Sequence, residues 1–145
     1  MSKTDLEKLL KVTVTAAQHL LKKNREMYPI GAIIDLEGEV LLAQPNFVTE
    51  RPGSQQVIDE LLRIFREKAE QHKIRATAIC YDGRVTPPGK TEKTDAICVE
   101  LEDIEGNAIA IFLPYKKGWL RKQKYQQPFA FTGESKIFDI NQIYT

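Results

Sequence analysis

Apolar residues recur at three- and four-residue intervals along two stretches of the chain, a spacing that predicts two amphipathic helices. The first helix is predicted from about Thr4 to Met27, and Thr4-Asp5-Leu6-Glu7 has the pattern of a capping box. Its apolar face is expected to comprise Leu6, Leu9, Leu10, Thr13, Ala17, Leu20 and Leu21. The second helix is predicted from about Ser54 to Lys73. Its apolar stripe is Val57, Ile58, Leu61, Leu62, Ile64 and Phe65.

Shorter apolar stretches, several of them alternating with polar residues, predict the β-strands. Residues 30–35 and 40–43 lie on either side of Glu37-Gly38, which predicts a hairpin with its turn at these two residues. Later strands are predicted over residues 74–81, 94–101 and 108–115, with a weaker one near 129–140.

A register is also predicted for the two strands that surround Glu105-Gly106-Asn107. Apolar residues alternate with polar ones before this turn, and a second alternating apolar set follows it. We expect Leu101 to lie opposite Ile111 and Val99 opposite Leu113, because an odd shift would turn one apolar set outward.

The predicted order is a helix, a β-hairpin, a second helix and then three or four antiparallel strands. Short connections favour antiparallel neighbours, because a parallel pair needs a longer crossover. The sequence therefore predicts one α+β domain over residues 1–145, with a single antiparallel sheet and two helices over one face or end.

This order, together with Gly31-Ala32-Ile33-Ile34-Asp35 in the hairpin, resembles the roadblock/profilin-like architecture. That resemblance implies a 2+3 arrangement of strands around a central helix, in small domains that act as dimeric adaptors or regulators. Residues 29–40, PIGAIIDLEGEV, also resemble the opening of the cytidine deaminase fold. The zinc ligands of that family are missing, since residues 46–71 contain no histidine and no Pro-Cys-x-x-Cys follows, which excludes deaminase activity.

The composition is that of an ordinary globular domain, with 42% hydrophobic and 28% charged residues and a net charge of +1. A charge so near zero gives no overall attraction to nucleic acid or anionic lipid, so any such binding must be local. No apolar run approaches the length of about 18–20 residues that a membrane span needs, and the first ten residues lack the apolar region of a secretory signal. We therefore expect a cytoplasmic protein without a membrane partner.

The connection over residues 82–94, with the sequence DGRVTPPGKTEKT, is the first candidate site. Its Pro87-Pro88-Gly89 is typical of a type II turn, and loops of this length are often functional. Three basic side chains in it are candidates to bind an anionic group: Arg84, Lys90 and Lys93. In the alternative interpretation the strands extend to Val85 and from Thr91, which leaves a tight turn with solvated charges.

The segment over residues 116–125 is the second candidate site, because five of its ten residues are basic. It also contains Trp119 and Tyr125, and this mixture suits an acidic partner as well as phosphates and stacked bases. Alternatively, it is a solvated loop whose tryptophan covers the edge of the core. The candidate contact residues around this segment are Tyr115, Lys116, Lys117, Trp119, Arg121 and Lys122.

No catalytic, metal or cofactor site is predicted from the sequence. His19 and His72 have no second ligand at metal-binding spacing, and Cys80 and Cys98 have no candidate base. If the strands that hold the two cysteines pair, the thiols could lie near each other.

Three functions stay open, in the following order. The first is a non-catalytic interaction or ligand-binding module, with a regulatory or toxin-neutralising partner protein as one subtype, that dimerises through a sheet edge or the first helix. The second is a small enzyme that acts on an anionic metabolite, with acid, base and anion contacts from Tyr81, Asp82, Lys93 and Asp95. The third is nucleic-acid binding through residues 116–125.

Overall fold

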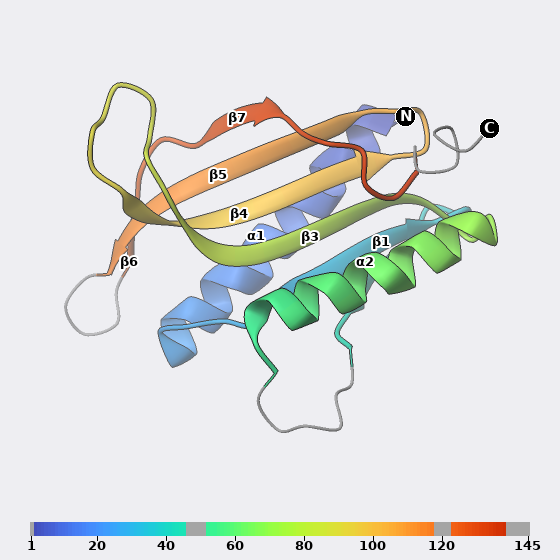
Figure 1. The fold of residues 1–145 in the computed structure, drawn as a ribbon, viewed down its shortest axis with the longest axis horizontal. Helices are drawn as coiled ribbons and strands as arrows, with labels where there is room; N and C mark the ends of the chain where they lie inside the picture. The colour runs from blue at the N-terminus through green and yellow to red at the C-terminus, as the bar shows by residue number, and fades with distance from the viewer. Residues whose placement is uncertain (1, 46–51, 118–122, 139–145) are drawn as a thin grey trace.

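The computed structural model describes residues 2–45, 52–117 and 123–138, and it has two helices on opposite faces of an antiparallel sheet (Figure 1). The helices are α1 (Ser2–Asn24) and α2 (Ser54–Glu70). The strands are β1 (Ile30–Asp35), β2 (Val40–Ala43), β3 (Ile74–Val85), β4 (Thr94–Asp103), β5 (Ala108–Lys117), β6 (Gln123–Tyr125) and β7 (Phe129–Thr132). These described strands form one seven-stranded sheet in the order β2-β1-β3-β4-β5-β6, and β7 also pairs with β5. The predicted α+β class with one antiparallel sheet is confirmed.

Both faces of the sheet are apolar, which is why the two helices lie on opposite sides instead of sharing one face. In β3, Ala76, Ala78 and Cys80 pack with α1, whereas Ile79 between them packs with α2. Successive side chains of a strand point to opposite faces, so a strand with apolar residues at successive positions needs a covering layer on each side. Neither of the two described helices is long and apolar enough to cross a membrane.

Helix α1 begins at Ser2, so Thr4 lies inside the helix and the predicted capping box is wrong. Asp5 instead pairs with Arg75 at the start of β3, with 2.8 Å between Oδ2 and Nε. The helix ends three residues earlier than predicted, where Arg25 adopts a left-handed φ of 63°. The helix therefore ends at this left-handed residue, before the chain reaches Pro29.

Helix α2 begins at the predicted Ser54 and ends three residues earlier than predicted. Val57, Leu61 and Phe65 of its apolar stripe are buried. Gly31 of β1 lies beneath this stripe, and a Cβ atom at that position would lie 2.6 Å from Cζ of Phe65. The glycine therefore permits the close approach of the helix to the sheet.

The β1–β2 and β4–β5 hairpins close with the same turn, formed by Asp-Leu-Glu-Gly in one and Asp-Ile-Glu-Gly in the other. In each turn the aspartate, Asp35 or Asp103, accepts hydrogen bonds at Oδ1 from the N–H groups two and four residues later. The glycines, Gly38 and Gly106, have φ values of 92° and 94°. The aspartate therefore fixes where the first strand of each hairpin ends.

This turn corrects the predicted register of β4 and β5. Val99 and Leu101 lie opposite Ile111 and Ile109, two residues away from the predicted partners. The even shift keeps both apolar sets on one face of the sheet, as expected. The predicted pairing centred the turn on Gly106, whereas the hydrogen bonds of the aspartate centre it one residue earlier.

Strands β3 and β4 are longer than predicted, which leaves residues 86–93 as their connection. The predicted turn forms within it: Gly89 has a φ of 77°, and the Lys90 N–H donates to the Pro87 carbonyl. The weak strand predicted near residues 129–140 is β7, which is shorter and pairs with β5 of the same chain, and β6 was not predicted.

Residues 133–138, which we call the C-terminal segment, follow β7 and are held by the buried Glu102 of β4. The Glu102 carboxylate accepts hydrogen bonds from the three successive backbone N–H groups of residues 136–138. Ile137 is buried in the cluster that includes the apolar stripe of α2. Arg66 of α2 donates a hydrogen bond from Nε to the backbone carbonyl of Lys136 at 2.7 Å. These contacts fix the C-terminal segment on the α2 side of the sheet.

Candidate functional site

The α2 side of the sheet is only partly covered. Helix α2 packs over β1 and β3, through a cluster that includes Ile33 and Ile79. Figure 1 shows β4, β5 and β7 beside it with no described helix in front of them, while α1 lies behind the sheet. The C-terminal segment lies at one end of this open area, and the connection over residues 86–93 lies at the other. An open sheet face between two such boundaries is a candidate binding surface.

Three phenylalanines, which we call the phenylalanine cluster, lie together on this open face. Phe112 of β5 lies opposite Phe129 of β7, with 5.2 Å between their ring centroids. The ring of Phe131 lies 6.1 Å from that of Phe112 and 5.7 Å from that of Phe129, in edge-to-face arrangements. Phe131 is 57% exposed, and the other two are half-buried. The cluster therefore presents ordered aromatic rings to solvent.

An open depression of about 370 Å³, which we call the lysine depression, lies where the 86–93 connection approaches the end of β5. It is lined by Pro87, Lys90, Glu92, Lys93, Thr94, Lys116 and Gln126. Three of these residues are lysines and one is acidic, so the depression carries an excess of positive charge. Ammonium groups arranged in this way suit a carboxylate or a phosphate.

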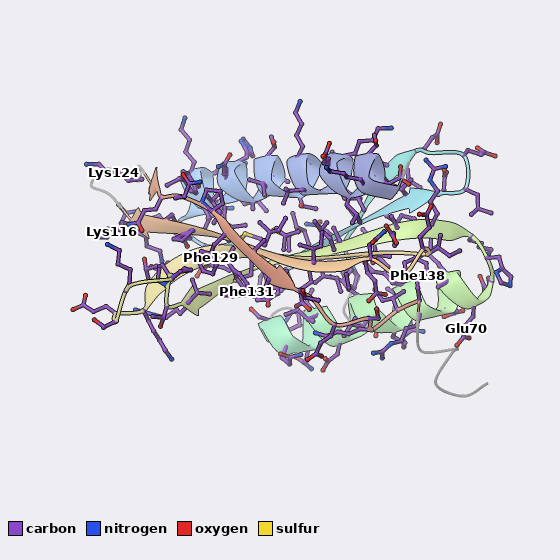
Figure 2. All side chains as sticks on the ribbon, turned by 90° about the horizontal axis from the view of Figure 1, so that it is seen from above. Glu70, Lys116, Lys124, Phe129, Phe131 and Phe138 are labelled. Atoms are coloured by element: carbon purple, nitrogen blue, oxygen red, sulfur yellow. The ribbon has the colours of Figure 1, made fainter. Side chains whose placement is uncertain are left out.

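The phenylalanine cluster and the lysine depression share one face of the sheet. Phe112 and Lys116 are four residues apart on β5, so their side chains point to the same side. Lys124 of β6 lies opposite Lys116 and adds positive charge at this end. Figure 2 shows Lys116 and Lys124 at one end of the molecule and Phe129 and Phe131 further along the sheet. One surface therefore combines an apolar area with a basic end.

The structure brings the two candidate sites of the sequence together. Lys90 and Lys93 from the first and Lys116 from the second line the same depression. Arg84 does not line it, because it lies on β3 opposite Asp95. The two segments therefore form one basic region, although they are separated in the sequence.

Tyr115 and Lys117 alternate with Lys116 on β5 and therefore point to the α1 side of the sheet. Tyr115 is fully buried (0% exposed) in the cluster beneath α1. This corrects its prediction as a contact residue, because a side chain in the core has no surface to offer to a partner. Trp119, Arg121 and Lys122 lie outside the described residues.

The phenylalanine cluster was not predicted from the sequence. The available signal was the alternation in Phe129-Ala130-Phe131, which places both rings on one face of a strand. Their contact with Phe112 depends on the pairing of β7 with β5, which no local pattern fixes. The three phenylalanines therefore contribute aromatic rings to this surface, and the buried Tyr115 does not.

The four residues named for the enzyme hypothesis do not form one cluster, although Asp82 and Asp95 lie near each other. Tyr81 and Asp82 are neighbours on β3 and point to opposite faces, whereas Lys93 lies in the connection after that strand. The Tyr115 hydroxyl donates to Oδ1 of Asp82 at 2.8 Å. Burial raises the pKa of the Asp82 carboxyl, and the nearby carboxylate of Asp95 adds to this effect. Asp82 is therefore engaged in a hydrogen bond on the side of the sheet that faces away from Tyr81.

Cys80 and Cys98 lie on adjacent strands, but on opposite faces of the sheet. Cys80 lies opposite Val99, and Cys98 lies opposite Tyr81. Burial raises the pKa of both thiols, that of Cys98 to about 12. Both are therefore protonated at neutral pH and are poor nucleophiles. Within the part of the chain that the structure describes, no three His, Cys, Asp or Glu side chains form a group that could hold a metal ion.

Comparisons with known proteins give no relative of this chain. No family model matches it, and neither a curated protein nor a solved structure matches it. The resemblance to roadblock/profilin-like domains is therefore unconfirmed.

Proposed function

We propose that this chain is a non-catalytic protein-binding module that holds an acidic, apolar segment of a partner against its open sheet face. The observation that carries the proposal is the phenylalanine cluster beside the lysine depression on one surface. Apolar side chains of the partner would pack on the rings, and its carboxylates would pair with the lysines.

The phenylalanine cluster would supply most of the affinity. Aromatic side chains are enriched at the centres of protein interfaces, where removal of their apolar area from water favours binding. The rings of Phe112, Phe129 and Phe131 already contact one another. Binding would therefore restrict these side chains little further, and the small loss of side-chain entropy favours affinity.

The lysines would supply selectivity for an acidic partner. Lys90, Lys93, Lys116 and Lys124 place four positive charges at this end of the sheet, and Glu92 is the acidic residue of the depression. The whole chain has a net charge of only +1, so this charge is local. Such a local field speeds the association of an acidic partner, and salt weakens the effect.

A random peptide library displayed on phage tests the aromatic part of the proposal. We expect peptides selected on the wild-type chain to combine Asp or Glu with aromatic or large aliphatic residues. A Phe129→Ser/Phe131→Ser variant should bind the synthesised peptides at least about tenfold more weakly, as expected for loss of central aromatic contacts. The matched control is Leu36→Ser/Ile104→Ser, which removes two apolar residues, each 54% exposed, from the hairpin turns. It should leave peptide binding unchanged, and thermal unfolding should show that both variants are folded.

The electrostatic part is tested with the same peptides and a Lys90→Glu/Lys93→Glu/Lys116→Glu variant. Association measured by surface plasmon resonance should be slower, and added salt should speed it instead of slowing it, because the reversed charges repel an acidic peptide. Peptides that bind all variants equally would contradict the proposal. A labelled single-stranded oligonucleotide that binds more tightly than any selected peptide would replace it with nucleic-acid binding.

A further inference from the structure

Strand β2 is a terminal strand of the sheet and presents apolar side chains on both of its faces. Its four residues, Val40–Ala43, include no charge, and Leu41 and Leu42 are 48% and 59% exposed. Natural edge strands usually carry charges, prolines or bulges that prevent pairing with another chain. An uncharged edge with two exposed leucines therefore favours pairing.

The hydrogen bonding of the β1–β2 hairpin shows which groups of β2 point outward. The Asp35 N–H donates to the Glu39 carbonyl at 3.0 Å, so these two residues form a hydrogen-bonded pair. Hydrogen-bonded and non-hydrogen-bonded pairs alternate along an antiparallel ladder. In the register of this hairpin, the main-chain groups of Leu41 therefore point toward β1, and those of Val40 and Leu42 point away from the sheet.

We infer that a second copy of this chain pairs with β2, antiparallel and about a two-fold axis through Leu41, so that two sheets become continuous. Leu41 then lies opposite Leu41 of the second copy. Val40 lies opposite Leu42 of the second copy and exchanges hydrogen bonds with it through the outward main-chain groups. The symmetry repeats this second pair on the other side of the axis.

Over residues 40–42, this register matches apolar residues with apolar residues. A shift by two residues in one direction would place Glu39 opposite Leu41, and a shift in the other direction would place Val40 opposite Gln44. An odd shift would place side chains of opposite faces across from each other, which the pleat does not allow. The proposed register therefore pairs the three largest apolar side chains of the strand, Val40, Leu41 and Leu42, with one another, and it places Glu39 opposite Ala43 at each end.

A hollow of about 330 Å³ beside β2 also suits a second copy. It lies on the α1 side of the sheet and is lined by Ala16, His19, Leu20, Ile30, Leu42 and Gln44. In the proposed pair, Val40 of the second copy lies beside Leu42 on this same side and covers part of the hollow. Four residues of strand form a small interface, so we expect a dimer that dissociates on dilution.

A single cysteine at the proposed axis tests the pairing directly. In a non-hydrogen-bonded antiparallel pair the Cα atoms lie about 4.5 Å apart, which is within the range of a disulfide. A Leu41→Cys variant should therefore form a disulfide-linked dimer under mild oxidation. The native thiols, Cys80 and Cys98, are buried and should stay reduced. The control is Leu36→Cys, whose leucine is similarly exposed in the adjacent turn but lies far from the axis.

We expect Leu41→Cys to cross-link at least about tenfold faster than Leu36→Cys, because pairing raises the effective concentration of one thiol near the other. Sedimentation of the wild-type chain over a dilution series should show a monomer–dimer equilibrium. Leu41→Lys should shift it toward monomer by at least about tenfold in dissociation constant without changing thermal unfolding, because like charges would meet at the axis. A monomeric wild-type chain at every concentration, or equal cross-linking of the two cysteine variants, would overturn the inference. Both readouts are independent of the phenylalanine cluster.

Discussion

At the scale of single residues, Asp82 shows how burial and hydrogen bonding oppose each other. Burial is the largest influence on this carboxyl and raises its pKa. The hydrogen bond from the Tyr115 hydroxyl and the charge of Lys117 act in the opposite direction, whereas the carboxylate of Asp95 acts in the same direction as burial. The net result is a raised pKa, so the ionised form is less favourable in the folded chain than in the unfolded one.

The sign of this shift leads to a prediction about pH. Because folded Asp82 keeps its proton to higher pH than unfolded Asp82, stability should fall as pH rises from the ordinary pKa of 3.8 through the raised folded value. Asp82→Asn keeps an oxygen acceptor for Tyr115 and removes the charge. Its urea midpoint should therefore be higher than that of the wild-type chain at pH 7, and the two midpoints should converge below the ordinary pKa.

Tyr115→Phe is the matched comparison for this prediction. It leaves the half-buried carboxylate of Asp82 without its hydroxyl donor, which should cost about 1–3 kcal/mol of unfolding free energy at neutral pH. Urea unfolding at several pH values measures both variants. A loss of stability in Asp82→Asn that is the same at every pH would show that packing, and not charge, governs this position.

At the scale of elements, the sequence predicted those features that residues close together in the chain determine, such as helix starts and turns. The start of α2 at Ser54, the hairpin around Gly38 and the turn at Gly89 follow from apolar spacing and from residues with special backbone preferences. The register of β4 and β5 was missed by two residues because side-chain hydrogen bonds of Asp103 centre that turn. Apolar alternation alone is satisfied by either even register.

For a related reason, the sequence indicated only part of the proposed binding surface. Lys90, Lys93 and Lys116 were recognised as basic residues, but their shared depression forms where the 86–93 connection approaches the end of β5. The contact of Phe112 with the rings of β7 likewise depends on a strand pairing across an intervening segment. Such long-range pairings are set by the whole sheet, and short sequence patterns do not contain them.

The C-terminal segment provides a prediction at this same scale. Glu102→Ala removes the acceptor of the N–H groups of residues 136–138, two of which lie 2.7 Å from its carboxylate. Loss of these charged hydrogen bonds should cost at least about 2 kcal/mol of unfolding free energy. Glu100→Gln is the control, because it loses a partly exposed ion pair with Lys136 and should cost less than about 1 kcal/mol. Slow amide exchange at residues 136–138 in Glu102→Ala would show that other contacts hold the segment.

At the scale of the whole molecule, two apolar clusters lie on opposite faces of one sheet and share its strands. Ala32 and Ile34 of β1 belong to the cluster under α1, and Ile33 between them belongs to the cluster under α2. Strand β3 is divided between the two clusters in the same way. Loss of either helix would expose one apolar face of β1 and β3 while their other face stayed covered. Because both clusters depend on the same two strands, we expect the domain to unfold as a single cooperative unit.

Large-to-small substitutions in each cluster test this cooperativity. Leu9 of α1 and Phe65 of α2 are both 0% exposed, so Leu9→Ala should cost about 2–5 kcal/mol and Phe65→Ala about 3–5 kcal/mol of unfolding free energy. Leu36→Ala, at an exposed turn position, should change it by less than about 0.5 kcal/mol. Helix content from circular dichroism and amide signals of β1 and β4 should give the same urea midpoint in each variant, because the shared strands cannot keep one face packed while the other opens. A Phe65→Ala variant that loses part of its helix signal before its β4 signals would show instead that α2 unfolds separately, and the sheet with α1 would then be the cooperative core.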